Sequence, residues 1–467
     1  MKILFLYNNF LPEIHWNCLK AQERNMGAIP PLNLCYVAAI ARKFGHHVDL
    51  IDMQVEPYSF TELVGLIKKY KPDILGFTIT TYLFHPMLEW IRKIKEATGT
   101  PILVGGFHMS LYPHETMAHT EIDFAIIGNL EETLRDFLNA FNDYNLYKNI
   151  EGLCYKRNGR IFVNKFARIR HVNLNTLPFP ARDLLKNDLY GNFISKAKNF
   201  TPMLTGIGCP FQCKYCASTL SKCLTRAPKN VVDEIEECVE KYGVKEIDFY
   251  DQSFTIDKKR AAEICRMIIQ RGIKIIWTIR TRTDLIDAEL LKIMKEAGLR
   301  RIMYGIESGS QEILDRLNKK EVLEDMVRIV ELTHDYGISV FGFFMLGCPG
   351  ENHQTLCLTK ELALSLPFDE IQVTRFTLFP GTEFYKEYLQ TTGGDDYWAQ
   401  YVLNKNNVKR LPLMDTAFTS LEIEMYVKNM YLKFYLRPKI IIRKIIDIGF
   451  MQIFKKYIRA LVDMVLN

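Results

Sequence analysis

The strongest constraint on the fold is a regular alternation of short apolar stretches with amphipathic ones along a chain of 467 residues. Up to about residue 140, stretches rich in Ile, Val, Leu and Phe predict strands, and stretches with apolar residues at helical spacing predict helices. The expected strands are KILFLYN, HVDLIDM, DILGFTIT, PILVGGF and FAIIGN, and the expected helices are NLCYVAAIARKFG, FTELVGLIKKYK and HPMLEWIRKIKEATG. This order predicts a doubly wound parallel sheet.

Ligands of such a sheet bind at the carboxyl ends of its strands. The loops that we therefore expect at the binding edge are 30–34, 78–82, 105–108 and 128–131.

A β-hairpin and a linker are expected after this sheet. Residues 151–165 alternate as two strands around Asn158–Gly159, a two-residue turn. The prolines of LPFPARDLL, 177–185, resist helix formation and indicate a linker.

From about 200 to 385 the alternation resumes and predicts a closed or partial (β/α)6 barrel with its active site at the carboxyl ends of the strands. The expected strands are PMLTGIG, EIDFYD, IIWTIRT, RIMYGIES, SVFGFFMLG and EIQVTRFTL. The expected helices are NVVDEIEECVEKYG, KKRAAEICRMIIQRG, DAELLKIMKEAG, a pair across 310–336, and HQTLCLTKELALSL.

Composition limits the class of protein. The length predicts two or three domains, and 48% hydrophobic with 24% charged residues is ordinary for a globular protein. A net charge of +6 is too small to indicate nucleic acid as a partner. MKILFLYNNF predicts a first strand rather than an export signal, and no run of 18 uncharged apolar residues predicts a membrane span. With eleven cysteines and no export signal, we expect a reducing cytoplasmic setting.

Three cysteines, Cys209, Cys213 and Cys216, lie close together in GIGCPFQCKYCAS, directly after the first expected strand of the barrel. Structural zinc needs four ligands; Cys223 follows nearby, but no histidine occurs from 172 to 333. Three thiolates on a four-iron cluster would leave one iron open to a substrate or cofactor. The spacing favours an iron–sulfur cluster over zinc or three buried thiols.

The cysteine loop resembles the Cys-x3-Cys-x-aromatic-Cys signature of radical S-adenosylmethionine (SAM) enzymes. Four further segments resemble that family in the same order: RTRTDLIDAELLKIMKEAG at 280–298, GIESGSQEIL at 305–314, FGFFMLGCPGE at 341–351 and TLFPGTEFY at 377–385.

The N-terminal half is similar to the subfamily with an N-terminal cobalamin (B12)-binding domain, through PPLNLCYVAAIAR, GGFHMSLYPHE and LPFPARDLL. Two features depart from related patterns. GNLEET at 128–133 stands where the subfamily usually has Gly-Glu-Gly-Glu, and the Asp-x-His-x-x-Gly motif of other cobalamin proteins is absent. The alternative is a domain that has lost its cofactor.

The resemblance implies a fold in four parts. A Rossmann-like sheet of the B12-binding type covers 1–145, a hairpin and linker 146–194, a partial TIM-like radical SAM barrel 195–395, and a helical extension 396–467.

The resemblance also implies site residues. A [4Fe–4S] cluster would be held by Cys209, Cys213 and Cys216. The residues implied for SAM are Tyr215, Asp251, Gln252, Arg282, Gly305, Glu307, Ser308, Phe344 and Gly347. Those implied for cobalamin are Pro31, Leu34, Thr78, Gly105, Gly106, His108, Gly128 and Glu131. Glu307 as a surface or helix-capping carboxylate, and Arg282 as a structural ion pair, stay open as alternatives.

The implied function is reductive cleavage of SAM to a 5′-deoxyadenosyl radical, with methylation of an unactivated carbon after a first SAM has methylated cobalt. One alternative is a cobalamin-free cyclase, ring-rearranging or carbon–carbon coupling enzyme acting on a lipid or tetrapyrrole. Another is an iron–sulfur electron carrier or metal-binding module without SAM chemistry. We expect a small-molecule or lipid-like substrate and an electron donor such as flavodoxin or ferredoxin.

The C-terminal stretch 437–467 mixes large apolar residues with basic ones. It predicts a helix that either packs on the barrel or contacts a membrane surface, which would place a cytoplasmic protein peripherally at the inner face of the membrane.

Overall fold

The computed structural model describes residues 1–8, 10, 27–128, 130–166, 173–192, 195–220 and 223–442. These residues form two compact units. The first contains the N-terminal strand, 28–190 and 394–410, and the second contains 191–393 and the described residues from 411 onward.

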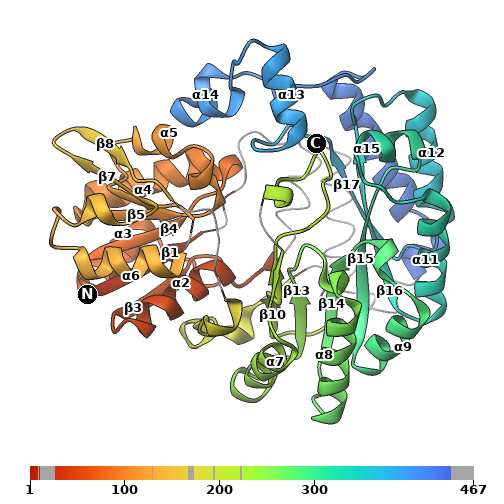
Figure 1. The fold of residues 1–467 in the computed structure, drawn as a ribbon, viewed down its shortest axis with the longest axis horizontal. Helices are drawn as coiled ribbons and strands as arrows, with labels where there is room; N and C mark the ends of the chain where they lie inside the picture. The colour runs from red at the N-terminus through yellow and green to blue at the C-terminus, as the bar shows by residue number, and fades with distance from the viewer. Residues whose placement is uncertain are drawn as a thin grey trace. The chain divides into compact units, whose positions relative to one another are not determined.

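The first unit is built on a seven-stranded sheet in the order β3-β1-β4-β5-β6-β7-β8 (Figure 1). Its parallel strands are β1 (Lys2–Tyr7), β3 (His47–Asp52), β4 (Ile74–Thr78), β5 (Ile102–Gly105) and β6 (Phe124–Ile126). Its helices are α2 (Leu32–Lys43), α3 (Phe60–Tyr70), α4 (Phe84–Thr98), α5 (Pro113–Met117) and α6 (Leu130–Ala140). The doubly wound sheet predicted from the sequence is therefore confirmed.

The predicted hairpin continues the same sheet. β7 (Leu153–Arg157) pairs antiparallel with β6, and β8 (Arg160–Val163) pairs antiparallel with β7. The turn residues Asn158 and Gly159 have φ of 51° and 73°. Both angles lie in the left-handed region that a type I′ turn requires, and Asn-Gly adopts it readily.

A segment far along the chain packs within the first unit. α14 (Tyr397–Leu403) lies in 394–410, and its carbonyl groups accept hydrogen bonds from two histidine side chains. His85 Nε2 lies 2.5 Å from the oxygen of Tyr401, and His119 Nε2 lies 2.8 Å from that of Val402. The first bond ties α14 to α4, and the second ties it to the segment that follows α5.

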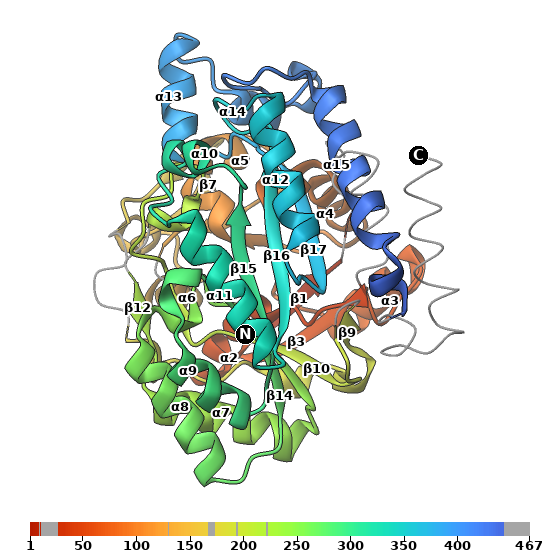
Figure 2. The same cartoon turned by 90° about the vertical axis from the view of Figure 1, so that its right-hand side faces the viewer.

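The second unit contains a six-stranded parallel sheet that curls into a half-barrel, in the order β10-β13-β14-β15-β16-β17 (Figures 1 and 2). The strands are β10 (Phe200–Met203), β13 (Glu246–Phe249), β14 (Ile276–Thr281), β15 (Leu299–Glu307), β16 (Ser339–Leu346) and β17 (Glu370–Arg375). The helices between them are α7 (Pro228–Tyr242), α8 (Lys258–Gln270), α9 (Ala288–Glu296), α10 (Gln311–Arg316), α11 (Leu323–Asp335) and α12 (His353–Ser365). This arrangement confirms the predicted partial barrel.

Alternate residues of these strands build the core between sheet and helices. Ile247, Trp277, Ile302, Val340 and Val373 are buried in one apolar cluster with helix residues. Because strand side chains alternate between faces, their neighbours in sequence point to the concave side of the half-barrel. Polar residues there do not disturb the apolar core.

Two helices follow β17 within the second unit: α13 (Glu383–Thr391) and α15 (Ser420–Tyr435), which lies beside β17 (Figure 2). The Tyr431 hydroxyl contacts both the backbone nitrogen and oxygen of Val373, at 2.7 and 3.1 Å. Tyr435 does the same at Ile371, at 3.1 and 2.8 Å. These hydroxyls satisfy backbone groups at the edge strand, which is otherwise a template for strand addition.

Within the described ranges, no helix is both long and apolar enough to cross a membrane. The prediction for 437–467 falls, from residue 443 on, outside the described residues.

Candidate functional site

The cysteine loop follows a short strand that the sequence did not separate from the first barrel strand. The expected strand PMLTGIG is two pieces, β10 and β11 (Gly206–Ile207), and β11 pairs antiparallel with β12 (Leu224–Thr225). The Asp251 carboxylate accepts the backbone N–H of Thr205 at 2.6 Å and also its hydroxyl, so the chain turns between the pieces. The cysteine loop therefore follows β11 and does not continue directly from the barrel strand β10.

The loop itself is fixed by backbone contacts. The Cys216 N–H donates to the oxygen of Cys213 at 3.1 Å. The Lys214 N–H donates to the oxygen of Leu317 at 3.0 Å, and the Asn318 side chain donates to the oxygen of Gln212 at 2.6 Å. The loop is thus docked on the turn that follows α10.

Cys209, Cys213 and Cys216 are all half-buried and interact electrostatically with one another. Burial raises the pKa of the Cys209 and Cys213 thiols, while the positive charge of Arg282 lowers both, and Lys319 lowers that of Cys213. Both cations favour the thiolate, the form that binds metal. Among the described residues, no group of three His, Cys, Asp or Glu side chains is placed to hold one metal ion. A cluster differs, because each cysteine binds a different iron.

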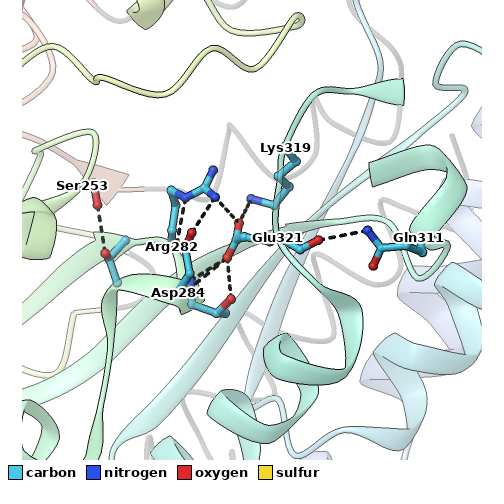
Figure 3. Close-up of polar contacts among 8 residues, drawn as sticks. Ser253, Arg282, Asp284, Gln311, Lys319 and Glu321 are labelled. Carbon is cyan, nitrogen blue, oxygen red and sulfur yellow. Dashed lines mark hydrogen bonds and ion pairs between the residues drawn. The ribbon is translucent and has the colours of Figure 1, made fainter. Parts of the chain in front are cut away.

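Arg282 lies directly beside the cysteine loop. Its guanidinium carbon is 3.8 Å from the ring centre of Phe211, a cation–π contact. Its Nε and Nη2 donate to the carboxylate of Asp284 at 2.9 and 2.8 Å (Figure 3). Its Nη1 is buried and has no hydrogen-bond partner among the described residues. A buried donor without an acceptor indicates a site for an anionic or carbonyl group.

Two further charged residues lie next to Arg282, and the sequence analysis did not identify them. Lys319 and Glu321 are buried and form an ion pair of 2.6 Å. Glu321 also accepts the backbone N–H of Thr283 at 2.9 Å, and its backbone oxygen accepts the Gln311 side chain at 3.1 Å (Figure 3). The only signal in the sequence was a run of opposite charges, KKE, within the stretch 310–336 for which a pair of helices was expected.

Glu307 ends β15 in a left-handed backbone conformation, with φ of 68°. Pairing of β15 with β16 is irregular between Gly305 and Glu307, so the carboxylate turns back over Gly305. A Cβ placed on Gly305 would lie 2.8 Å from Glu307 Oε1, too close for any larger residue without a shift. Tyr215 donates to Glu307. Burial raises the pKa of both groups, and Lys319 lowers that of Glu307.

The structure thus brings Cys209, Cys213, Tyr215, Arg282 and Glu307 together. The alternative that Arg282 only forms a structural ion pair explains its contacts with Asp284. It does not explain Nη1, which has no hydrogen-bond partner among the described residues. Glu307 is neither exposed nor at a helix start.

Other residues implied for SAM turn their side chains elsewhere. Ser308 is fully buried, and its hydroxyl pairs with that of Thr359 at 3.0 Å. The Phe344 ring lies in the core, edge-on to Phe368 at 5.5 Å. Only the backbone of Ser308 and Phe344 is left to border a ligand.

Asp251 and Gln252, both implied for SAM, differ in how far they are buried. The Asp251 carboxylate is buried, and burial raises its pKa while its bonds to Thr205 lower it. Gln252, the next residue, is exposed.

Gly347 follows β16 with φ of 78°, and its N–H donates to the buried carboxylate of Glu351. A Cβ on Gly347 would lie 2.5 Å from Cδ1 of Ile423. Glu351 therefore fixes the turn after the strand, a role that the sequence did not reveal.

In the first unit, Thr78, Gly105 and Gly106 lie together at the carboxyl edge of the sheet. Thr78 pairs with Gly105, and its hydroxyl accepts the Asn33 side chain at 2.8 Å. Among the described residues, a Cβ on Gly105 would meet nothing within 4 Å. Gly106 has φ of 117°, and a Cβ there would lie 2.7 Å from the oxygen of Ile79.

His108 is buried beneath this edge, and burial lowers its pKa to about 3. Both ring nitrogens are hydrogen-bonded, Nδ1 to Thr81 at 2.9 Å and Nε2 to Thr116 at 3.0 Å. The ring is neutral and has no free nitrogen for a metal.

The other residues implied for cobalamin occupy different positions in the same unit. Pro31 precedes the first turn of α2, and the Leu34 side chain is in the core of the unit. Gly128 has φ of 80°, and Glu131 forms a 2.7 Å ion pair with Lys43. All eight thus belong to the first unit, and all nine implied for SAM belong to the second.

Each of the two units contains a region that matches a known protein family. Residues 26–138 match the B12 binding domain, and residues 203–363 match the Radical SAM superfamily. An uncharacterized methyltransferase of Pyrococcus horikoshii is 32% identical over 92% of this chain and 93% of its own length. An anaerobic magnesium-protoporphyrin IX monomethyl ester cyclase of Cereibacter sphaeroides is 27% identical over 91% of this chain and 70% of its own.

A solved radical SAM methyltransferase, TsrM from Kitasatospora setae with cobalamin and a [4Fe–4S] cluster bound, has the same fold. Its TM-score is 0.67 at 18% identity, over 84% of this chain and 75% of that one. The chain is a radical SAM enzyme, as the cysteine loop predicted. Within that superfamily it belongs to the cobalamin-dependent subfamily with an N-terminal B12-binding domain.

These two domains imply a [4Fe–4S] cluster, SAM and cobalamin as cofactors. The residues fit the first two: three half-buried thiols lie near two cations, and the unsatisfied Arg282 donor suits the carboxylate of SAM. For cobalamin, Gly105 has no side chain, and no described residue lies within 4 Å of a Cβ built on it, so nothing described blocks the sheet edge at this point. The roles of individual residues stay predictions.

Proposed function

We propose that this chain is a cobalamin-dependent radical SAM methyltransferase that methylates an unactivated carbon. The relative that is similar over nearly its whole length is named a methyltransferase, and so is the solved neighbour TsrM. When bound, the cluster supplies the electron that cleaves SAM, and cobalamin carries the methyl group.

The observation that carries the radical SAM part is the unsatisfied Nη1 of Arg282 beside the three thiols. Because Asp284 fixes the other guanidinium nitrogens, Arg282 presents this donor in one orientation. A carboxylate bound there gains a charge-assisted hydrogen bond with little loss of side-chain freedom.

Other residues shape the same region. Gly305 makes room for the Glu307 carboxylate because it has no side chain, and Tyr215 donates a hydrogen bond to that carboxylate. Glu351 fixes the turn at Gly347, so that its backbone keeps one conformation. These residues bind and orient; none of them needs to exchange a proton with the substrate.

We also propose that cobalamin binds to the first unit without His108 as a ligand of its cobalt. Its two ring nitrogens are engaged with Thr81 and Thr116, so a bond to cobalt would require both hydrogen bonds and its buried position to be given up. Protein in complex with cobalamin should therefore lack the electron paramagnetic resonance signature of a nitrogen ligand from His108.

The test of methylation uses protein reconstituted anaerobically with cluster and cobalamin. It is incubated with reductant, with SAM carrying a CD3 methyl group, and with polyisoprenoid lipids and tetrapyrroles as candidate substrates. Methylation predicts a product with one CD3 group, together with S-adenosylhomocysteine and 5′-deoxyadenosine in similar amounts. A product that carries no CD3 group contradicts it.

The second candidate is a cyclase or carbon–carbon coupling enzyme acting on a lipid or tetrapyrrole. It is favoured by the similarity to the magnesium-protoporphyrin cyclase over 91% of this chain. In the same assay it predicts an unlabelled cyclic product and 5′-deoxyadenosine without S-adenosylhomocysteine. An electron carrier predicts neither SAM product.

One partner follows from the proposed chemistry. Each turnover consumes electrons, so we propose a low-potential protein donor of the flavodoxin or ferredoxin kind. A single-turnover reduction by each donor, compared with dithionite, measures whether it reduces the cluster.

A further inference from the structure

A buried lysine stands next to the cysteine loop, in the turn between α10 and α11. The side chain of Lys319 is 2% exposed. Its neighbours Asn318 and Lys320 both have left-handed backbones, with φ of 53° and 57°. Non-glycine residues rarely adopt this conformation, and two of them here turn Lys319 inward.

Three observations place Lys319 close to Gly305 and the cysteine loop. Its Nζ lies 3.6 Å from the point where a Cβ would stand on Gly305. The same turn holds the cysteine loop, through the oxygen of Leu317 and the side chain of Asn318. The charge of Lys319 therefore acts on both Cys213 and Glu307.

The counter-charge is equally well held. The side chain of Glu321 is 1% exposed and pairs with Lys319 at 2.6 Å. Backbone N–H of Thr283 donates to it at 2.9 Å, and Nη2 of Arg282 lies 3.7 Å away (Figure 3). Buried ion pairs contribute little net stability on average, because desolvation offsets their attraction. Stability alone does not account for a pair at this place.

We propose that Lys319 and Glu321 are positioning charges that set the reduction potential of the cluster on Cys209, Cys213 and Cys216. Reduction adds one electron, and so one negative charge, to the cluster. A nearby cation stabilises the reduced form and raises the potential, and a nearby anion does the opposite. The electron comes from the external donor, and neither residue gains or loses a proton.

The inference rests on the cluster that the proposed function requires, but not on methyl transfer. A potential can be measured without substrate, cobalamin or SAM. Failure of methylation therefore leaves it standing, and failure of the potential test leaves the methylation proposal standing.

The experiment is a redox titration of the full chain, reconstituted anaerobically and followed by electron paramagnetic resonance of the reduced cluster. The variants are K319Q, E321Q and the double variant, with K320Q as control because Lys320 is exposed and adjacent. We expect K319Q to lower the ratio of reduced to oxidised cluster at fixed potential about tenfold, which is 59 mV for a one-electron couple. E321Q should shift it in the opposite direction, the double variant should return close to wild type, and K320Q should leave it unchanged.

A purely structural role predicts a different pattern. A variant that distorts the fold shifts the reduction potential in a direction that does not depend on the sign of the charge removed. Shifts of K319Q and E321Q in the same direction, no shift in either, or an equal shift in K320Q would each overturn the proposal. Before the titration, the iron content of each variant is measured to check cluster binding, and its circular dichroism to check folding. If K319Q binds no cluster, E321Q alone decides, and absence of a rise in the reduction potential of its cluster overturns the proposal.

Discussion

Replacing Glu351 with glutamine is expected to stabilise the turn after β16 at alkaline pH and to leave it unchanged at acidic pH. Glu351 is 1% exposed, and one of its carboxylate oxygens accepts the N–H of Gly347. The other oxygen, Oε1, has no hydrogen-bond partner among the described residues. Ionisation therefore leaves a negative charge in an apolar environment with few donors.

The size of the effect follows from the pKa. Burial raises the pKa of Glu351 from 4.5 to about 7, although the N–H groups of Gly347 and Cys348 oppose the rise. The folded state thus binds the proton more tightly than the unfolded chain does. The stabilisation is fully present below the unfolded pKa and is lost as the pH rises through the folded one. A shift of this size corresponds to about 3 kcal/mol, since each pKa unit is about 1.4 kcal/mol.

Hydrogen exchange of the peptide that covers 339–351 measures this locally, which suits a chain of two units. Comparing wild type with E351Q at each pH cancels the intrinsic dependence of exchange on pH. At pH 5 we expect the opening free energies of the two proteins to differ by less than about 1 kcal/mol, and at pH 8 we expect E351Q to be more stable by up to about 3 kcal/mol.

The matched control is E361Q, which removes an exposed carboxylate from the neighbouring helix α12. It should show no difference from wild type at either pH. A difference between wild type and E351Q that is the same at pH 5 and pH 8 would refute the reasoning, because the carboxyl would then not titrate in this range.

Three further changes test the site. C213A should abolish cluster binding, whereas C357A, which removes an exposed cysteine, should keep the iron content of wild type. R282K should weaken SAM binding about tenfold or more at unchanged iron content, since a hydrogen bond to a charged group contributes about 1.5–3 kcal/mol; equilibrium dialysis measures it, and unchanged affinity contradicts the assignment. G106A should reduce cobalamin binding, because φ of 117° and a contact of 2.7 Å with a backbone oxygen exclude a Cβ, whereas G65A, in open space on α3, should bind as wild type does.

Most of the fold could be predicted from periodicity. The alternation of strand and helix patterns located the five parallel strands of the first large sheet and all six strands of the second, because buried strands such as β4 and β16 are almost wholly apolar. The hairpin was predictable from Asn158–Gly159, since few pairs adopt two successive left-handed residues. The break between β10 and β11 was not, because it depends on the side chain of Asp251, 46 residues from Thr205 along the chain.

The site was predictable only where function imposes a local pattern. The three cysteines and Glu307 lie in motifs, whereas Lys319 and Glu321 lie in a loop whose only signal is charge. Their burial depends on the docking of that loop against the cysteine loop, a contact between residues about 100 positions apart, such as Gln212 and Asn318 at separation 106. Single-sequence patterns carry no information on such contacts.

The most direct test of the central claim is the formation of 5′-deoxyadenosine. Protein reconstituted anaerobically with its cluster, and supplied with SAM and a strong reductant, is predicted to release 5′-deoxyadenosine, and variants of Cys209, Cys213 and Cys216 are predicted to release none. Absence of this product from wild-type protein with a full, reducible cluster would contradict the assignment of the chain's chemistry.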